Sequence, residues 1–574
     1  MTERGDQQAL PRPAPAVDRG PLDDRFYDLV ESRFVRLVRD NPILGTALGL
    51  HQDDDLLGDR SRDQVLAELA AERTHLSAVE ALDPADLSGE ARFERELEIH
   101  NLRRSIFDID LLRIWERRSF ALDSVGDGLF LLFARDHAPL AERLSAIAGR
   151  LEAVGTFVEE AKTRATVPQV RLWQQIEIET AGDLPAFLDE LVAAGNGVLG
   201  RPEQRRLDRA AETAKIAIDL YATWLEGTLA AGQDEWAIGR DRHDTMVDLR
   251  GFDGLDADAI LELGWQRLGE ERAARAAAAR EIDPDADEAT VIDRVKSDHP
   301  ANFDAALDGY RESMLRARRH LIEHGLVSIP DDERIEVIAT PDYLRKVMPF
   351  AAYFEPAAFD PDPKGIYVVT PSVDGDPDAM REHNYASISN TSIHEAYPGH
   401  HLQLDTARRH PSLTRLLTDA PEFVEGWGMY SELMMREQGF DADPRFRLIM
   451  HTDAIWRACR IILDVRMHRG EIGVEEATNF LVEQTSFERP QAHAEVQWYT
   501  YRPTYPLSYL LGRTLLLGLR GDEQRRLGER FSLKTFHDTL LRNGSLPISF
   551  HRRLVAGGER APWPVAAATS HSPA

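Results

Sequence analysis

The sequence predicts a mainly helical protein with one small β-sheet, which precedes a helix that carries the principal functional motif. Apolar residues recur at three- and four-residue spacing from residue 23 to about residue 328, as expected for helices that bury one face. Three β-rich segments separated by proline-containing turns follow between residues 334 and 370. Helical spacing then resumes.

The first part of the chain is predicted to be a helical scaffold. Phe26, Val30 and Phe34 recur at helix spacing, and residues 257–282 are rich in Ala, Leu, Glu and Arg, which favour helices. We find no fixed-period repeat and no phosphate-binding or dinucleotide-binding fingerprint in this part. The chain is accordingly divided into a disordered tail at 1–22, a helical scaffold or lid at 23–330, a catalytic half at 331–560 and a disordered tail at 561–574.

The three strand candidates come directly before the principal motif. Residues 334–340 alternate in polarity, and residues 351–354 and 365–370 are rich in β-branched and aromatic side chains. We expect them to form a small antiparallel sheet.

Composition argues against several classes of function. The net charge of −30 opposes binding to nucleic-acid backbones and to anionic membranes. No run approaches the ~20 apolar residues that span a bilayer, and the first 20 residues lack the apolar core of a signal peptide. A cytoplasmic protein is therefore expected. The single cysteine, Cys459, excludes an intrachain disulfide and is interpreted as a small buried residue.

The principal motif is His-Glu-Ala-Tyr-Pro-Gly-His-His at residues 394–401. In the common zinc-hydrolase helix, two histidines four positions apart share one face, and the glutamate between them is the general base. Here Pro398 occupies the position of the second histidine, so the common form fails. Because Pro-Gly often ends a helix, the same residues would also suit a polar helix end.

His400 and His401 are the alternatives for the second ligand. On a straight helix His400 points roughly 240° away from His394, and His401 shares its face but lies roughly 10 Å further along. Pro398 removes a backbone donor, and Gly399 tolerates unusual dihedral angles. A two-residue bulge at these positions would bring His400 into place, so we prefer His400 and keep His401 as the alternative.

Glu425 is the predicted third ligand. A catalytic zinc commonly takes three protein ligands and leaves one position for water. Glu425 follows His400 by 25 positions (425 − 400), and its apolar neighbours leave its carboxylate in need of a partner. The stretch Val-Glu-Gly-Trp-Gly resembles Asn-Glu-Gly-Phe-Ala of zinc aminopeptidases, whose glutamate is a metal ligand. Glu432, on the same helix face, is predicted to hold a ligand imidazole.

Other candidates lie around this motif. Tyr509, with Tyr499 as a second choice, is predicted to donate to the oxyanion of a tetrahedral intermediate, although most such aromatic residues belong to the core. Tyr367 and Arg513 are candidates for substrate contact. The polar residues of 456–468 are interpreted as a buried salt-bridge network, with substrate-carboxylate binding by an arginine as the alternative.

Five motifs together resemble the bacterial domain-of-unknown-function family 885 (DUF885). They are His-Glu-Ala-Tyr-Pro-Gly-His-His-Leu-Gln, Glu-Gly-Trp-Gly-Met-Tyr-Ser-Glu, Arg-x-x-Arg-x-x-x-Asp-x-x-x-His, Glu-Val-x-x-Tyr and Leu-Ser-Tyr-x-x-Gly. The resemblance extends from about residue 24 to about residue 555. It implies kinship with gluzincin-like metallopeptidases, and hence a large helical zinc-peptidase-like fold that encloses a deep cleft. The sequence departs from the family at Thr504-Tyr505, where Pro-Gly-Gln is usual, and at Trp498, where Arg is usual.

The sequence therefore predicts a zinc-dependent peptidase that acts on a peptide or another small amide. His394, His400 and Glu425 would hold one Zn²⁺ per chain. Glu395 would accept a proton from the metal-activated water and pass it to the leaving amine. Two alternatives remain, namely a metal-dependent hydrolase of a non-peptide amide or ester, and a non-catalytic helical binding protein with a vestigial metal site.

Overall fold

A computed structural model describes residues 18–340, 351–371, 379–485 and 487–556, together with residues 10 and 345. The structure is 71% helix and 3% strand by residue. This confirms the mainly helical fold with a small sheet. The tail predicted at 561–574, and most of the one predicted at 1–22, lie outside the described residues.

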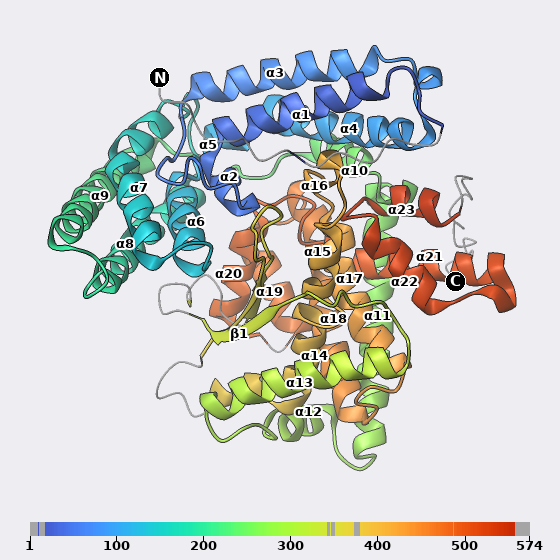
Figure 1. The fold of residues 1–574 in the computed structure, drawn as a ribbon. Coiled ribbons are helices and arrows are strands. Elements are labelled where there is room, and N and C mark those ends of the chain that lie inside the picture. Colours follow the sequence, from blue (N-terminus) through green and yellow to red (C-terminus); the bar gives the residue numbers. More distant parts are fainter. Residues whose placement is uncertain are drawn as a thin grey trace.

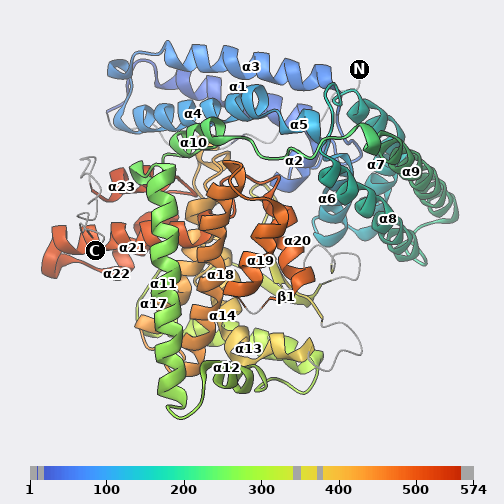
Figure 2. The ribbon, with the colours of Figure 1, turned by 180° about the vertical axis from the view of Figure 1, so that it is seen from behind.

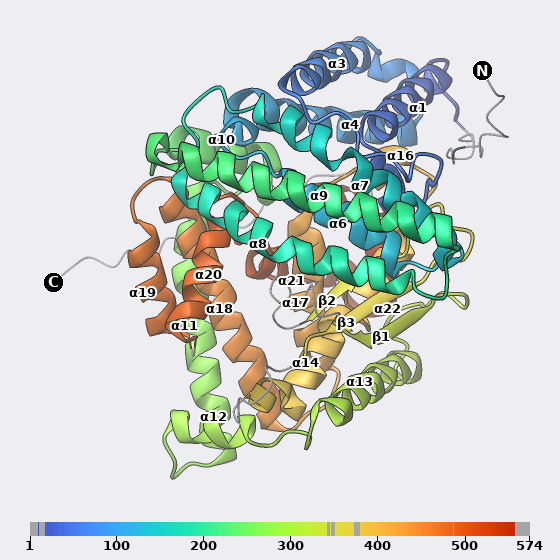
Figure 3. The ribbon, with the colours of Figure 1, turned by 90° about the vertical axis from the view of Figure 1, so that its left-hand side faces the viewer.

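The N-terminal half consists of helices that lie in distinct groups (Figure 1). They are α1 (Asp23–Asp40), α2 (Pro42–Leu48), α3 (Arg62–Glu80), α4 (Gly89–Phe107), α5 (Ile114–Arg117), α6 (Ala121–Ala134), α7 (Leu140–Lys162), α8 (Arg171–Ala194), α9 (Arg201–Thr228), α10 (Arg240–Arg250), α11 (Ala257–Ile282), α12 (Glu288–Lys296) and α13 (Phe303–Glu323). Helices α1, α3 and α4 gather at one end, and α7, α8 and α9 run side by side (Figure 3). The groups α1–α4 and α6–α9 each supply most of a separate apolar cluster, and Leu413 of the C-terminal half joins the first of them.

Side chains at the helix starts explain several of these boundaries. A serine, aspartate or asparagine that precedes the first turn accepts a hydrogen bond from a backbone N–H that has no partner within the helix. Such caps are Ser61 for α3, Ser88 for α4, Asp256 for α11, Asp287 for α12 and Asn302 for α13.

The three predicted strands are confirmed as β1 (Ile335–Ala339), β2 (Ala351–Phe354) and β3 (Gly365–Val369). Their order is β1-β3-β2, with β1 parallel and β2 antiparallel to β3. The prediction of an antiparallel sheet is therefore wrong for one pair, and the sheet is mixed. Every residue of β3 is buried, as expected for a central strand covered on both faces. Alternating polarity shows which face a side chain occupies, but it does not show the direction of the neighbouring strand.

The C-terminal half is again helical. Its helices are α14 (Tyr385–Glu395), α15 (His400–Ala407), α16 (Leu413–Leu416), α17 (Pro421–Glu437), α18 (Pro444–His468), α19 (Val474–Gln484), α20 (Arg489–Tyr499), α21 (Ser508–Leu527), α22 (Leu533–Arg542) and α23 (Ile548–Val555). Helix α11 of the N-terminal half runs alongside α18 (Figure 2). The largest apolar cluster accordingly draws on residues from both sides of residue 330.

Helices α17 and α21 are in backbone contact at two glycines. A Cβ atom at Gly512 would lie 1.9 Å from the backbone oxygen of Glu422 and 2.7 Å from the Cα atom of Gly426. Any side chain would therefore push the two helices apart. Gly426 directly follows Glu425 in the chain, so this contact sets the position of Glu425 relative to α21.

We expect Gly512→Ala to lower the stability of the fold by about 3 kcal/mol, because overpacking between rigid backbones is relieved only by moving a helix. Gly521→Ala on the same helix is the matched control. Its Cβ atom would meet only the end of the Arg525 side chain, at 3.4 Å, and alanine has the higher helix propensity. Thermal unfolding should therefore show a lower midpoint for Gly512→Ala and an unchanged or higher midpoint for Gly521→Ala. Equal midpoints for the two variants would contradict the packing argument.

Candidate metal centre

The helix that carries the principal motif is interrupted between its histidines. Helix α14 ends at Glu395 and α15 begins at His400, so the expected two-residue bulge is in fact a four-residue break at Ala396–Gly399. A Cβ atom at Gly399 would lie 1.8 Å from the backbone oxygen of His394, and only glycine therefore fits there. The break places the His394 and His400 rings 4.7 Å apart and nearly perpendicular, at 89°.

Three buried side chains converge at this break. The ligand atoms of His394, His400 and Glu425 all lie within 4.8 Å of one another. Glu425 Oε2 is 3.7 Å from His394 Nε2 and 3.4 Å from His400 Nε2. Two donors on a tetrahedral zinc with bonds of ~2.1 Å are separated by about 3.4 Å. Two imidazoles and one carboxylate form a donor set that catalytic zinc sites use, with a fourth position open, so these residues fit the ion.

Glu432 and Asn390 orient the first histidine. Glu432 Oε1 lies 2.7 Å from His394 Nδ1, and Asn390 Nδ2 donates to Glu432 Oε2 at 3.0 Å and to Asp453 Oδ2 at 2.9 Å. A carboxylate on Nδ1 fixes the tautomer and leaves Nε2 free to bind a metal. Behind the ring, a Cβ atom at Gly428 would lie 2.6 Å from His394 Cε1. The geometry predicted for Glu432 is therefore present.

Without a bound cation, the two carboxylates that contact His394 favour its protonated form. Burial lowers the pKa of His394, but its hydrogen bonds to Glu425 and Glu432 outweigh that effect and raise the pKa to about 10. Burial opposes the shift of Glu425 too, yet hydrogen bonds from His394 and His400 hold its pKa well below the usual range. A cation that binds here must displace this proton.

Glu395 lies beside the cluster but is not part of it. Its side chain is half-buried. Across the part of the chain that the structure describes, no hydrogen bond or ion pair engages its carboxylate, whereas Glu425 and Glu432 are both engaged. Glu395 therefore has a carboxylate available to accept a proton next to the ligands.

His401 points elsewhere, since one residue turns a helix by about 100°. Its Nε2 atom lies 2.8 Å from Glu333 Oε2 and its Nδ1 atom lies 2.9 Å from the Tyr353 hydroxyl. Both ring nitrogens are thus occupied, and the alternative of His401 as the second ligand is wrong. The residue instead ties α15 to β2.

Tyr505 contacts the cluster, and the sequence did not reveal it. Its hydroxyl donates to Glu425 Oε1 at 2.9 Å, and its ring lies 6.1 Å from that of Tyr509. Burial raises the pKa of Tyr509, and the nearby Glu425 carboxylate raises it further. Tyr509 is therefore a protonated phenol near the ligands, as its predicted role requires. The only signal for Tyr505 was the departure from the family pattern at that position.

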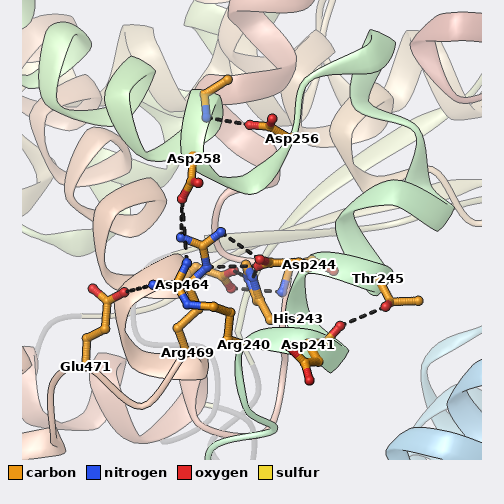
Figure 4. Close-up of polar contacts among 12 residues, drawn as sticks. Arg240, Asp241, His243, Asp244, Thr245, Asp256, Asp258, Asp464, Arg469 and Glu471 are labelled. Atoms are coloured by element: carbon orange, nitrogen blue, oxygen red, sulfur yellow. Dashed lines mark hydrogen bonds and ion pairs between the residues drawn. The ribbon is translucent and has the colours of Figure 1, made fainter.

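A buried polar network holds the turn that carries Tyr505. Thr504 has a φ angle of 63°, which is strained for a β-branched residue. Its backbone N–H donates to Asp464 Oδ2 at 2.9 Å, and its carbonyl accepts from Arg250 Nη1 at 2.9 Å. The other oxygen of Asp464 lies 3.0 Å from His243 Nε2 (Figure 4). The interpretation of Asp464 as part of a buried network fits this geometry, and the network positions Tyr505.

Burial excludes direct roles for three further candidates. The Tyr499 hydroxyl donates to Glu495 at 2.8 Å, and the ring is fully buried. Tyr367 is 0% exposed on the central strand, and Arg513 is 4% exposed and paired with Glu271. Tyr499 and Tyr367 have no accessible surface through which to touch a substrate, and Arg513 has almost none and is paired with Glu271. The oxyanion role of Tyr499 and the substrate contacts of Tyr367 and Arg513 are therefore corrected to structural ones.

Comparisons with known proteins identify a family and a fold. A family model described as bacterial protein of unknown function (DUF885) matches residues 42–555. A solved structure from Colwellia psychrerythraea, described as a candidate lipoprotein, has a TM-score of 0.82 at 17% identity and covers 93% of this chain and 98% of its own. Another from Shewanella oneidensis, a candidate lipoprotein of unknown function, has a TM-score of 0.76 at 20% identity, covering 92% and 99%. No curated protein matches. At these identities the likeness shows the fold alone.

Among the residues with a described structure, every helix is too short or too polar to cross a membrane.

Proposed function

The chain belongs to the bacterial family of unknown function DUF885, and from its candidate metal centre we propose that it is a metal-dependent hydrolase that cleaves peptide bonds. One observation carries the proposal: three buried candidate ligand atoms converge within 4.8 Å, beside Glu395, whose carboxylate has no hydrogen bond or ion pair among the described residues. A purely structural site has no need of such a base.

Each residue of the site has a separate role in the proposed reaction. Zinc in this position would lower the pKa of a bound water towards ~7 and polarise the scissile carbonyl. Glu395 accepts the proton of the attacking water and returns it to the leaving amine. Tyr509 donates a hydrogen bond to the carbonyl oxygen as negative charge develops on it. Glu432 and Tyr505 hold His394 and Glu425 in place.

A substrate panel tests the proposal. Protein loaded with one equivalent of zinc is assayed against short peptides, small non-peptide amides and esters, and a chelator is used to remove the metal. We expect cleavage of peptides that is lost with the metal and restored by zinc. Cleavage of esters or small amides alone would favour the non-peptide hydrolase, and zinc binding without any turnover would favour the binding protein.

The two tyrosines should separate into different roles. Tyr505→Phe removes the hydrogen bond to Glu425, and loss of such an outer contact typically weakens metal affinity about 10- to 100-fold. Tyr509→Phe should leave zinc affinity unchanged and lower kcat about 100-fold, because it removes a donor to the transition state. Zinc titration and steady-state kinetics of both variants check this. Unchanged zinc affinity in Tyr505→Phe would refute the orienting role.

A further inference from the structure

Arg457 on α18 is a cation with no direct ion pair among the described residues of this acidic protein. Its neighbour on the same helix face, Arg460, has a partner, since Arg460 Nη2 donates to Glu495 at 2.9 Å. No hydrogen bond or ion pair to the Arg457 guanidinium occurs within the described ranges, and its buried Nε atom has no partner. Acidic residues number 98 against 68 basic ones, so partners are abundant. Asp453, one turn earlier on α18, acts on Arg457 through its charge but not through a direct contact in the described structure, so the guanidinium donors remain available to an anionic ligand.

Arg457 stacks on Trp456 and lies near Tyr509 of the candidate metal centre. Its guanidinium carbon is 3.6 Å from the centroid of the Trp456 ring and 6.0 Å from that of Tyr509. The Tyr509 ring in turn lies 6.1 Å from Tyr505, whose hydroxyl contacts Glu425. Arg457 is therefore two aromatic rings away from a proposed ligand.

A second chain of contacts leads from the same place to the other side of the cluster. Asp453, one turn before Arg457 on α18, accepts a hydrogen bond from Asn390, which also donates to Glu432. Glu432 contacts His394. Arg457 thus stands between the two sets of side chains that contact the proposed ligands. Burial raises the pKa of Asp453 and the charge of Arg457 opposes that rise, but no hydrogen bond or ion pair joins the two side chains among the described residues.

We propose that Arg457 binds the terminal carboxylate of the substrate, so that the hydrolase acts on peptides whose free C-terminus lies close to the scissile bond. This rests on the proposed function and specifies its substrate class. A guanidinium presents paired donors in a plane, which matches the two oxygens of a carboxylate. Stacking on Trp456 fixes that plane before the substrate arrives.

A merely structural role makes a different prediction. If stacking on Trp456 were the whole function of Arg457, its removal would lower the stability of the fold and would weaken the binding of all substrates equally. Binding of a carboxylate instead predicts discrimination between a peptide acid and the corresponding peptide amide. That discrimination is the quantity to measure.

The test uses full-length, zinc-loaded protein with Glu395→Gln as background, so that peptides bind without being cleaved. Calorimetry compares Ala-Ala-Ala with its C-terminal amide. We expect the free acid to bind about 10- to 100-fold more tightly, the range for hydrogen bonds to charged groups. Adding Arg457→Ala should remove the difference, and Arg457→Lys should restore part of it. The matched control is Arg447→Ala, also on α18, which removes an exposed ion pair with Glu281 of α11 and should change neither affinity.

The outcomes separate this inference from the proposed function. Equal affinities for acid and amide, or an equal loss for both in Arg457→Ala, would overturn the carboxylate site even if peptides are cleaved by the wild type. If Ala-Ala-Asp amide, whose only carboxylate is a side chain, bound more tightly than the free acid Ala-Ala-Ala, Arg457 would not be specific for a terminal carboxylate. Discrimination that depends on Arg457, without cleavage of any peptide by the wild type, would support the carboxylate site and refute the hydrolase.

Discussion

Glu395→Gln is expected to keep its zinc and to lose turnover by about 10³-fold. The amide has nearly the same shape as the carboxylate but cannot accept a proton, and general-base catalysis typically contributes 10²- to 10⁴-fold. Glu395 lies outside the cluster formed by His394, His400 and Glu425, so the ligand set is unchanged. Metal analysis of the purified variant and its kcat on a cleavable peptide measure the two effects separately.

Glu437→Gln is the matched control for this substitution. It lies at the end of α17, where its partly exposed carboxylate pairs with Arg520, and it should change neither metal content nor kcat. Unchanged turnover in Glu395→Gln would exclude Glu395 as the base. Loss of zinc in the same variant would show that Glu395 is a ligand.

His400→Ala is expected to abolish stoichiometric zinc binding, and His401→Ala is expected to retain it. A three-residue site that loses one imidazole keeps two donors, which is too few for a catalytic zinc. His401 instead contacts Glu333 and Tyr353. Its removal takes the ring partner from the Tyr353 hydroxyl and one of several partners from Glu333, and should lower stability by about 1–3 kcal/mol. The measurements are zinc content per chain and the midpoint of thermal unfolding.

His401→Ala is the matched control for His400→Ala, because both histidines are buried and the two substitutions remove the same atoms. About one zinc in the wild type and in His401→Ala, with none in His400→Ala, is the expected pattern. The reverse pattern would move the ligand by one residue. A wild type that binds no zinc after supplementation would leave the proposed hydrolase without its metal.

Local chemistry explains why so much of the ligand cluster could be predicted. Pro398 and Gly399 show from the sequence alone that the motif helix cannot continue, which favours His400 over His401. The apolar neighbours of Glu425 indicate a carboxylate that needs a partner, and Glu432 follows from helix spacing. The length of the break was underestimated, because the close approach of Gly399 to the His394 carbonyl is a property of the folded chain.

Long-range contacts explain what could not be predicted. The hydrogen bond from Tyr505 to Glu425 joins residues 80 positions apart, and no periodicity in the sequence connects them. The burial of Tyr367 on the central strand depends on which strands flank it. Tyr499 and Arg513 sit in patterns that suit either a core or a site, and only packing decides between the two.

The spacing of the ligands along the chain has a consequence for the order of folding. His394 and Glu425 are separated by 31 positions (425 − 394), whereas Tyr505 reaches Glu425 across 80. Shorter loops close at a lower entropic cost, and contacts that are local in sequence form earlier. The three proposed ligands can therefore meet before α21 and the turn that precedes it have docked. Zinc present during folding would then encounter the proposed ligands before Tyr505 and Tyr509 pack next to them.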